Sequence, residues 1–382
     1  MRLRFSRQSG VALIAALLLM TSIVFILGNI FYRHQINVAQ STLSIHQDQA
    51  YLLALSAESW ARQLLQEDLA DSDEDHFGEL WAQAIPAMPV DGGMVNGCIS
   101  DLQGRFNINN FMVSYKTPGD LSSALSSDGS SYAKTWNNLL RYLEMPVFPG
   151  RVEAIIDWLD IDSAMIGSEG AEQEEYAGNM PPQMIADTAM VEPNELSAVM
   201  GYEIFEVQRL MPWITALPVK ASTPGSTEKT TPINLNTASE ELLLALGGNL
   251  DRQFRDFVMS SRPFEDVLDF HRDLAIDLQM QEADVQRRWP DTLVGVVSDF
   301  FQLYVEVMLG EARIEVRSII MRSSPTDSVI IHRELTTVPS SVDKNSTSEM
   351  LEKLLAGSKS DKESEEIIDD QQVLPACVTI GA

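Results

Sequence analysis

An uncharged run from Val11 to Ile30, dominated by Leu, Ile, Ala and Val, constrains this chain more than any other feature. About 20 such residues in an α-helix span roughly 30 Å, the thickness of the hydrocarbon core of a bilayer. Arg2, Arg4 and Arg7 precede the run. Because basic residues stay on the cytoplasmic side, the sequence predicts a membrane span that leaves the rest of the chain outside the cytoplasm.

The helical pattern continues beyond the apolar run. Small and apolar residues recur at spacings of three and four from Ala50 to Leu65, which marks one face of a helix. No Pro or Gly lies between Asn29 and Leu69, so one helix of roughly 85–90 Å is predicted. A plain signal anchor with a helical neck is the alternative. A cleaved secretory signal fits less well, because its small residues follow the apolar core, whereas Gly10 precedes it here.

The chain is strongly acidic, with 27 basic against 55 acidic side chains and a net charge of −28. Such an excess repels nucleic acid and anionic lipid and favours basic or metal-ion partners. Its two cysteines are Cys98 and Cys377. If the chain is exported, they are free to form one disulfide; in a cytosolic protein they would be buried thiols, and the sequence leaves both possibilities open.

Strand patterns occur in two separate parts of the sequence. Apolar and polar residues alternate from Phe301 to Leu309, around Val316 and from Val329 to Leu335, which predicts three strands. An earlier strand hairpin is predicted from Gly92 to Phe111, with its turn at Gln103-Gly104.

Helical spacing dominates the sequence between these strands, as in Trp136, Leu139 and Leu140. The predicted fold is therefore α+β. An antiparallel sheet, residues 92–111 and 299–338, packs on the N-terminal helix, and an all-α domain, residues 115–290, is inserted between its strands. Residues 339–370 are rich in Ser, Lys, Asp and Glu and are predicted to be disordered.

An acid-rich loop follows the helix predicted to end near Leu159, and Gly167 and Gly170 lie within it. Hard cations such as Ca²⁺ bind about six to eight oxygen ligands from carboxylates and carbonyls in flexible loops. The spacing is not that of an EF-hand, and a solvated acidic loop without a cation is the alternative. The acidic residues concerned are Asp157, Asp160, Asp162, Glu169, Glu172, Glu174 and Glu175.

Motifs for catalysis are missing from the sequence. The five histidines lack zinc-site spacing, and neither G-x-S-x-G nor a phosphate-binding glycine loop occurs. The chain is predicted not to be an enzyme; a membrane-anchored hydrolase using the acid-rich loop is the alternative from another class. The run from Ile233 to Leu242 resembles the opening of helix-hairpin-helix DNA-binding modules, but its acidic surroundings oppose DNA, so no nucleic-acid partner is predicted.

The start of the chain resembles the class III signal of type IV pilins and pseudopilins: a basic leader, then Gly10, then an apolar helix with an amphipathic continuation. The resemblance implies that residues 1–10 are a leader removed by a prepilin peptidase, which methylates the new N-terminus at Val11. It also implies that the helix has a transmembrane part, residues 11–30, and a periplasmic part, residues 31–69.

One departure from that family pattern is informative. Most pilins carry a glutamate five residues into the mature helix, where this chain has Ala15. In the family, that glutamate neutralises the terminal ammonium of the subunit above, since both charges are costly to bury in hydrocarbon. A subunit without it fits only the top of a fibre. This departure, with the run from Asp101 to Asn109, resembles the K-type minor pseudopilins of type II secretion systems, whose pilin fold is interrupted by a large helical domain.

The resemblance implies a role in assembly. The chain would cap the tip of the type II secretion pseudopilus and support protein export across the outer membrane. Its implied partners are other minor pseudopilins, the major pseudopilin, the inner-membrane assembly platform and the prepilin peptidase. The implied location is the bacterial inner membrane, crossed once, with the bulk of the chain in the periplasm. A minor type IV pilin in adhesion or DNA uptake is the alternative.

Two sets of site residues follow. The stretch from Asp157 to Tyr176 resembles the one that binds calcium in K-type pseudopilins, which implies a structural calcium ion. For the contact with a partner helix, the small residues on one face of the long helix are the candidates, and packing on the chain's own sheet is the alternative. The implied calcium ligands are Asp160, Asp162, Glu172 and Glu175, then Glu169, and the helix candidates are Ala50, Ala54, Ala57 and Ala61.

Overall fold

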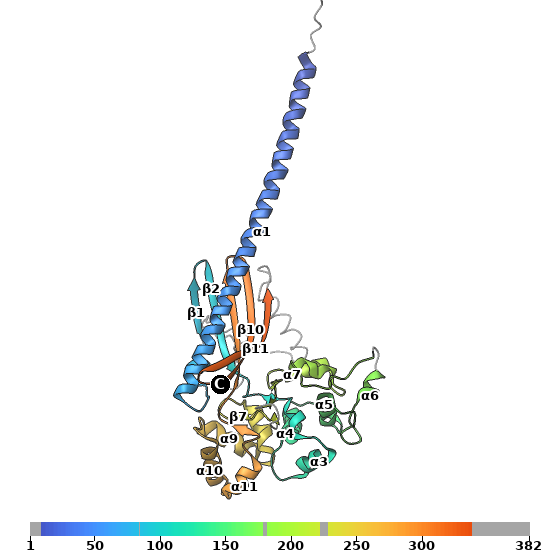
Figure 1. The fold of residues 1–382 in the computed structure, drawn as a ribbon, viewed down its shortest axis with the longest axis vertical. Helices are drawn as coiled ribbons and strands as arrows, with labels where there is room; N and C mark the ends of the chain where they lie inside the picture. The colour runs from blue at the N-terminus through green and yellow to red at the C-terminus, as the bar shows by residue number, and fades with distance from the viewer. Residues whose placement is uncertain (1–8, 84, 179–181, 222–227, 338–382) are drawn as a thin grey trace, which may run out of the picture.

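The structure is a computed structural model that describes residues 9–337 apart from residues 84, 179–181 and 222–227. Its longest element is α1, one helix from Ser9 to Asp71. The N-terminal part of α1 projects away from the molecule, and its C-terminal part lies against a sheet (Figure 1). The predicted unbroken helix is confirmed. Among the described helices, α1 is the one long and apolar enough to cross a membrane, with a mean hydropathy of 2.7 in its apolar window.

An antiparallel sheet with the strand order β1-β2-β9-β10-β11 packs on α1. Successive side chains of a strand point to opposite faces. On one face, Leu303 and Val305 of β9 are buried together with Ala50 and Ala54 of α1. The three predicted C-terminal strands are thus confirmed. The strands are β1 (Ile85–Val90), β2 (Gly93–Asp101), β9 (Phe300–Leu309), β10 (Ala312–Ser324) and β11 (Asp327–Thr337).

A buried charge fixes α1 to the sheet. Glu58 of α1 is 3% exposed, and its carboxylate accepts two hydrogen bonds from the Arg333 guanidinium of β11, at 2.7 and 2.5 Å. The Ser318 hydroxyl of β10 donates to the same carboxylate. Because the contact needs both the rotation and the height of Glu58 to be correct, it sets the register of the helix on the sheet.

The predicted hairpin from Gly92 to Phe111 is wrong in its position. The turn lies at Asp91 and Gly92, between β1 and β2, and Gly92 has φ +81°, a conformation that glycine adopts without strain. At Gln103-Gly104 the chain leaves the sheet instead. Glycine is required there for another reason: a Cβ on Gly104 would lie 2.7 Å from the carbonyl oxygen of Thr237.

The inserted domain begins with β3 (Phe106–Asn107), which pairs in parallel with β4 (Ile214–Thr215), and it ends near β8 (Val294–Gly295), which pairs in parallel with β7 (Ile233–Asn234). It is thus somewhat longer than the predicted residues 115–290. Two short strands, β5 (Lys220–Ala221) and β6 (Glu228–Lys229), form a separate antiparallel pair.

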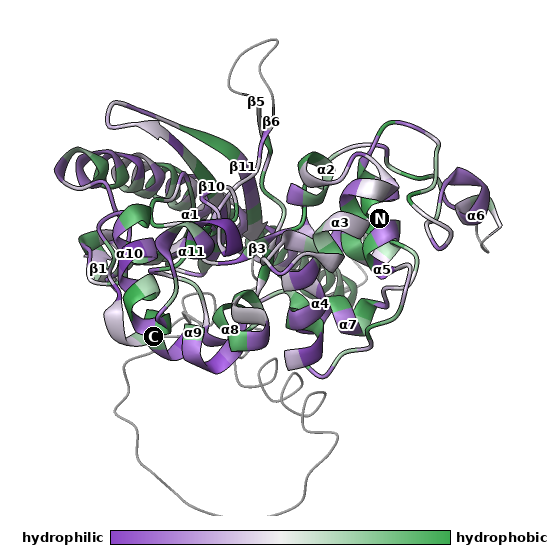
Figure 2. Cartoon of the chain, turned by 90° about the horizontal axis from the view of Figure 1, so that it is seen from below, coloured by the Kyte–Doolittle hydropathy of each residue, from purple (hydrophilic) through white to green (hydrophobic). Residues whose placement is uncertain are grey.

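The helices of the inserted domain share one hydrophobic cluster. Seen from below, α8 to α11 gather on one side of the domain and α2 to α7 on the other (Figure 2). The domain lies at the end of the sheet that is far from the free end of α1 (Figure 1). The helices are α2 (Asn110–Ser114), α3 (Pro118–Ser126), α4 (Tyr132–Tyr142), α5 (Arg151–Leu159), α6 (Gln173–Ala177), α7 (Ile204–Leu210), α8 (Glu240–Gly247), α9 (Asp251–Ser261), α10 (Val267–Leu278) and α11 (Glu282–Arg288), with 3₁₀ turns at Leu80–Ala82, Pro193–Ala198 and Gly248–Leu250.

A buried carboxylate joins the sheet to the inserted domain. Asp101, at the end of β2, accepts hydrogen bonds at one oxygen from Asn234 (3.0 Å), Thr237 (2.5 Å) and Ser298 (2.7 Å). Asn234 and Thr237 belong to the run that resembles helix-hairpin-helix modules, so their side chains serve this junction. Burial raises the pKa of Asp101 above its usual range, and the four groups that donate to its carboxylate oppose that rise.

Candidate functional site

The acid-rich loop is organised by Asp157, near the end of α5. Its side chain is fully buried, and its two carboxylate oxygens accept hydrogen bonds from the backbone N–H groups of Ile166 (2.8 Å) and Ala171 (2.7 Å). A Cβ on Gly170 would lie 2.1 Å from one of those oxygens, so glycine is required there. Asp157 therefore folds the loop back onto the helix that precedes it.

That fold brings three predicted ligands together. One carboxylate oxygen from each of Asp160, Asp162 and Glu172 lies within 4.8 Å of the others. Asp160 ends α5 and Glu172 precedes α6, so the group joins the ends of two helices. Asp162 is exposed, Asp160 is half-buried and Glu172 is only 6% exposed. We call Asp160, Asp162 and Glu172 the carboxylate cluster.

The carboxylate cluster is electrostatically unbalanced. Burial, with repulsion from Asp162 and Asp157, raises the pKa of Asp160 to about 6. Burial, with repulsion from Asp157 and Asp160, raises the pKa of Glu172 to about 7. Asp160 Oδ1 and Glu172 Oε1 are buried and accept no hydrogen bond from the described residues. Oxygens of this kind, close together and without donors, suit a hard cation such as Ca²⁺.

The other two predicted ligands are not part of the carboxylate cluster. A carboxylate oxygen of Glu175 accepts a hydrogen bond from the backbone N–H of Glu172 (2.9 Å), which caps α6. The Glu169 side chain is exposed, and its backbone carbonyl lies against Gly150. Sequence patterns did not indicate Asp187, although its charge contributes to the raised pKa values of Asp160 and Glu172. Asp187 has a positive φ of 49°, an unusual backbone conformation that cannot be read from the sequence.

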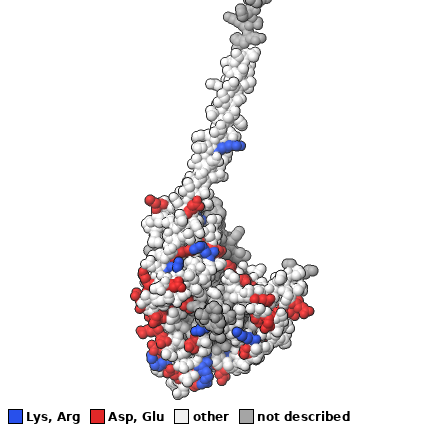
Figure 3. Space-filling view, in the orientation of Figure 1, with Lys and Arg blue, Asp and Glu red and all other residues white. Residues whose placement is uncertain are grey.

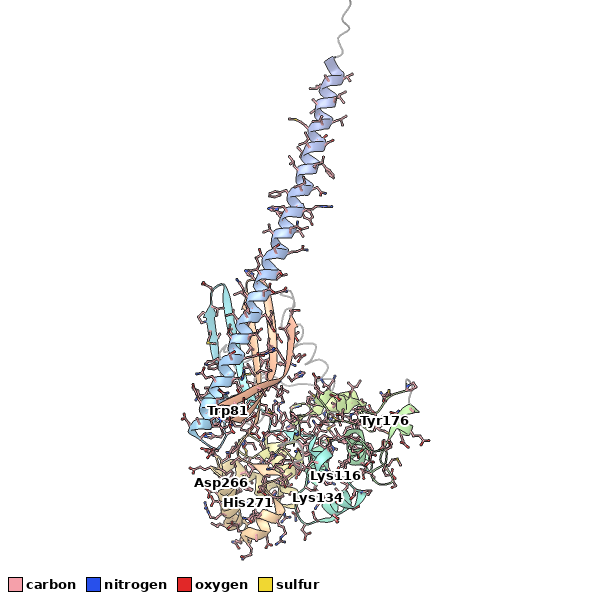
Figure 4. All side chains as sticks on the ribbon, in the orientation of Figure 1. Trp81, Lys116, Lys134, Tyr176, Asp266 and His271 are labelled. Atoms are coloured by element: carbon pink, nitrogen blue, oxygen red, sulfur yellow. The ribbon has the colours of Figure 1, made fainter. Side chains whose placement is uncertain are left out.

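A second group of acids, Asp68, Asp75 and Glu79, also brings carboxylate oxygens within 4.8 Å of one another, but it already has its cation. The Arg322 guanidinium lies 2.7 Å from Asp75 and 3.0 Å from Asp68, and Glu79 accepts from the Trp81 indole at 2.6 Å. Tyr176, beside the carboxylate cluster, and Trp81, beside this second group, lie on opposite sides of the molecule (Figure 4). The second group therefore already holds one cation, the Arg322 guanidinium, although burial still raises the pKa of Asp68 to about 6 and that of Asp75 to about 7.

The prediction that the alanine face of α1 contacts a partner helix is wrong. Ala50, Ala54 and Ala61 are fully buried in the chain's own core, and Ala57 packs against the same cluster. Their small side chains let the helix approach the sheet closely. The opposite face of α1 is exposed instead: Leu52 is 61% and Trp60 is 44% exposed.

The N-terminal processing site lies at the edge of the described chain. Gly10 and Val11 fall within α1, whereas Met1 to Gln8 lie outside the described residues. Processing therefore stays a prediction. The predicted disordered segment 339–370 and Cys377 also lie outside the described residues. Cys98 is disulfide-bonded, and its pairing with Cys377 stays a prediction.

Fold and surface together define a class of protein. The projecting part of α1 is apolar and nearly free of charged side chains, while acidic side chains spread over the body (Figure 3). The helix α1 is apolar at its free end and packs on an antiparallel sheet at its other end. This arrangement is typical of a membrane-anchored pilin-like subunit, here with a helical domain inserted between the strands.

Known proteins narrow that class to one family. Residues 104–219, which include the carboxylate cluster, match the family described as "Type II secretion system (T2SS), protein K". The chain is 30% identical over 337 residues to type II secretion system protein K of Aeromonas hydrophila, covering 86% of this chain and 97% of that protein. It is 29% identical over 318 residues to the Pseudomonas aeruginosa protein of the same name, covering 80% and 86%. The chain therefore belongs to the type II secretion system protein K family and is a minor pseudopilin of type II secretion.

A solved structure agrees with the fold. A chain of the GspK–GspI–GspJ complex from the enterotoxigenic Escherichia coli type 2 secretion system superposes with a TM-score of 0.63 at 22% identity. The superposition covers 78% of this chain and 99% of that chain. The pilin-like α+β fold with an inserted helical domain is thus confirmed.

Proposed function

We propose that this chain caps the tip of the pseudopilus, with its apolar helix among the helices of the subunits below. The observation that carries the proposal is Ala15, which leaves no carboxylate to pair with the terminal ammonium of a subunit above. The inserted domain adds a steric reason, because it covers the end of the sheet far from the membrane helix (Figure 1). The chain acts in this proposal by assembly and not by catalysis.

A labelled chain tests the position in the fibre. An epitope inserted in the loop between β10 and β11, at Pro325 and Thr326, is exposed and outside the contacts described above. We expect immunogold particles at one end of each pseudopilus and none along its shaft. Particles spaced along the shaft would contradict the tip position.

We propose that other minor pseudopilins bind the exposed face of α1. The related complex from enterotoxigenic E. coli holds GspK together with GspI and GspJ, which supports partners of this kind. The face is opposite the buried alanines and combines apolar side chains with small hydroxyls, which allow close helix packing. It consists of Ile45, Leu52, Ser56, Ser59, Trp60 and Gln63.

Two substitutions on α1 separate partner binding from folding. Leu52→Asp puts a charge on the exposed face and is expected to reduce co-purification of other minor pseudopilins at least tenfold while leaving the melting temperature unchanged. Ala54→Leu, on the buried face, is expected to lower stability by about 1–3 kcal/mol through overpacking. Thermal melts and pull-downs of both variants give the comparison. If Leu52→Asp binds partners normally, the exposed face is not the interface.

We further propose that a prepilin peptidase removes the leader after Gly10 and that the methylated chain remains in the inner membrane until assembly. The apolar free end of α1 and the basic leader support this. The intact mass of the membrane-extracted chain tests it: the mature N-terminus should be methylated Val11, and a retained Met1 would contradict the processing.

We propose a structural Ca²⁺ at the carboxylate cluster, held by Asp160, Asp162 and Glu172, with Asp187 close enough to add to its field. The ion would supply the positive charge that these buried oxygens lack. It would tie the end of α5 to the start of α6. A hydrolase using the same acids would instead keep its fold and lose an activity when they are replaced.

A further inference from the structure

A groove of about 950 Å³ lies in the inserted domain, between α4, the turn after α8 and α11. That volume is near the upper end of the range for ligand sites, roughly 300–1,000 Å³. Lys134 of α4, which lines the groove, lies at the end of the molecule opposite the free end of α1 (Figure 4). None of the lining residues belongs to the carboxylate cluster or to the exposed face of α1.

The groove is basic although the chain is acidic. Four basic and two acidic side chains line it, whereas the whole chain has 27 basic against 55 acidic side chains. A cleft lined mainly by charges of one sign attracts groups of the opposite sign, so the groove favours an anionic ligand. Its charged residues are Lys134, Arg141, Arg287 and Arg288, with Asp128 and Asp284. Of these, Arg287 and Asp284 pair with each other at 2.5 Å. We call this site the basic groove.

Two arginines of the basic groove keep a charge that no described carboxylate balances. Arg141 donates to the side-chain amide oxygen of Asn138 at 2.7 Å, and Arg288 donates to that of Asn249. An amide oxygen is neutral, so a ligand carboxylate would form stronger, charge-assisted hydrogen bonds with either guanidinium. Burial, with repulsion from Arg288, lowers the pKa of Lys134. The positive charges are therefore close enough to repel one another, and an anion between them would relieve that repulsion.

Hydrogen bonds hold the walls of the basic groove in place. Lys134 donates to the backbone carbonyls of Ser127 and, at 3.0 Å, Gly129. The backbone N–H of Ser130 donates to the carbonyl of Arg288 at 2.9 Å, which ties the loop after α3 to α11. The groove is thus formed before any ligand binds, which lowers the entropy that binding costs.

The other polar groups of the basic groove discriminate between anions. The groove carries hydrogen-bond acceptors beside its cations, in the side chains of Ser127, Asp128 and Asn137. A phosphodiester only accepts hydrogen bonds, whereas a peptide backbone donates as well as accepts, and Asp or Glu side chains bind guanidinium groups in a bidentate manner. An acidic peptide therefore fits better than nucleic acid. Nucleic acid is the competing ligand, because Gly247 and Gly248 of the groove follow the run that resembles helix-hairpin-helix modules.

We propose that the basic groove binds an extended acidic segment of another protein, with Arg141 and Arg288 pairing with its carboxylates. Charge complementarity and the two arginines without a carboxylate partner among the described residues carry this inference. It does not depend on the tip position or on calcium. Since the groove lies in the inserted domain, it stays accessible when α1 packs among the helices of other subunits (Figure 1).

Peptide binding tests the proposal on the full chain in detergent. The probe is a short fluorescein-labelled peptide of alternating Asp, Ser and Glu residues, followed by fluorescence anisotropy. Arg141→Gln with Arg288→Gln is expected to weaken its binding at least tenfold. Arg252→Gln with Arg272→Gln removes the same charge from exposed side chains outside the groove and should bind as wild type does. A groove variant that binds as tightly as wild type, or a wild type without saturable binding, would overturn the proposal.

Arginine modification covers the case in which the groove variant is unstable. In the unaltered chain, the acidic peptide should slow the reaction of Arg141 and Arg288 with phenylglyoxal at least fivefold and leave that of Arg272 unchanged, as mass spectrometry of the digest reports. A peptide with Asn and Gln in place of its acids should not protect. Equal modification with and without the acidic peptide would contradict the proposal. So would stronger protection by a single-stranded oligonucleotide, or protection without ligand that a deletion of Asp361 to Asp370 removes, since the chain would then fill its own groove.

Discussion

Replacing Asp160 with Asn and Glu172 with Gln together is expected to abolish the stabilisation of this protein by Ca²⁺. At about 100 times its Kd, a ligand that binds only the folded state adds ~2.7 kcal/mol, which raises the melting temperature of a chain of this size by roughly 3–5 °C. Wild-type protein should show that rise in differential scanning calorimetry with Ca²⁺ against EDTA. The double variant should show none.

The same variant has an opposite expected effect without calcium. In EDTA it should melt at a higher temperature than wild type, because two neighbouring carboxylates with raised pKa values no longer repel each other. Glu174→Gln, on the exposed side of α6, is the matched control and should keep the calcium response. A double variant that still gains stability from Ca²⁺ would show that the ion binds elsewhere.

Acid is expected to weaken the calcium effect. The folded pKa values of Asp160 and Glu172, about 6 and about 7, lie above the ordinary values of 3.8 and 4.5. Without calcium, the stabilising contribution of their protonated forms is complete below about pH 4 and is lost as the pH rises through about 6 to 7. Protons therefore compete with Ca²⁺ in that window. The calcium-dependent rise in melting temperature should be large at about pH 7.5 and small at about pH 5.5.

Replacing Arg322 with Met is expected to destabilise the fold by about 3–5 kcal/mol, because it leaves buried carboxylates without their cation. The Arg322 side chain is 1% exposed, and it donates hydrogen bonds to both carboxylate oxygens of Asp75 and to the carbonyls of Leu65 and Ser298. From β10, Arg322 thereby holds together α1, the loop after α1 and the segment before β9 that contains Ser298. The melting temperature should fall by roughly 4–9 °C.

Two comparisons make the Arg322 result specific. Arg317→Met, also on β10, removes a half-exposed arginine that lies 3.6 Å from Glu334, and it should cost less than about 1 kcal/mol. Adding Asp68→Asn and Asp75→Asn to Arg322→Met should restore at least half of the lost stability, since the orphaned charges are then gone. If the triple variant is no better than Arg322→Met, packing and not charge explains the loss.

The parts of the fold that were predictable are those with a repeating pattern. The long helix and the strands β9 to β11 were visible because their spacings of about 3.6 and 2 persist over many residues. The first strand was not predicted, since β1 contains Pro86 and Pro89, and proline weakens a strand pattern even where an edge strand tolerates it. The predicted hairpin was consequently placed too late, at a glycine that serves a close contact with Thr237.

The candidate site was only partly predictable for a different reason. An acid-rich loop is evident in the sequence, but which carboxylates converge depends on how Asp157 folds that loop back. Asp187 comes from a separate loop, so no local spacing indicates it. The contrast with Asp68 and Asp75 makes the same point: their cation, Arg322, lies far away in the sequence, and acid runs alone do not distinguish the two groups.

Because α1 is unbroken, the rotation of the inserted domain about the helix axis depends on where along that axis the helix sits. Glu58 and the buried alanines fix the C-terminal part of α1 to the sheet. Since no proline interrupts the helix on its N-terminal side, the apolar part of α1 and the sheet rotate together as one rigid unit. Each residue of an α-helix turns about 100° and rises about 1.5 Å. A single residue inserted between Ile30 and Ala50 would therefore swing the whole inserted domain by about 100° around the fibre axis. The direction in which the inserted domain faces is thus determined by which side of the apolar part of α1 contacts lipid or a neighbouring subunit, some tens of ångströms away.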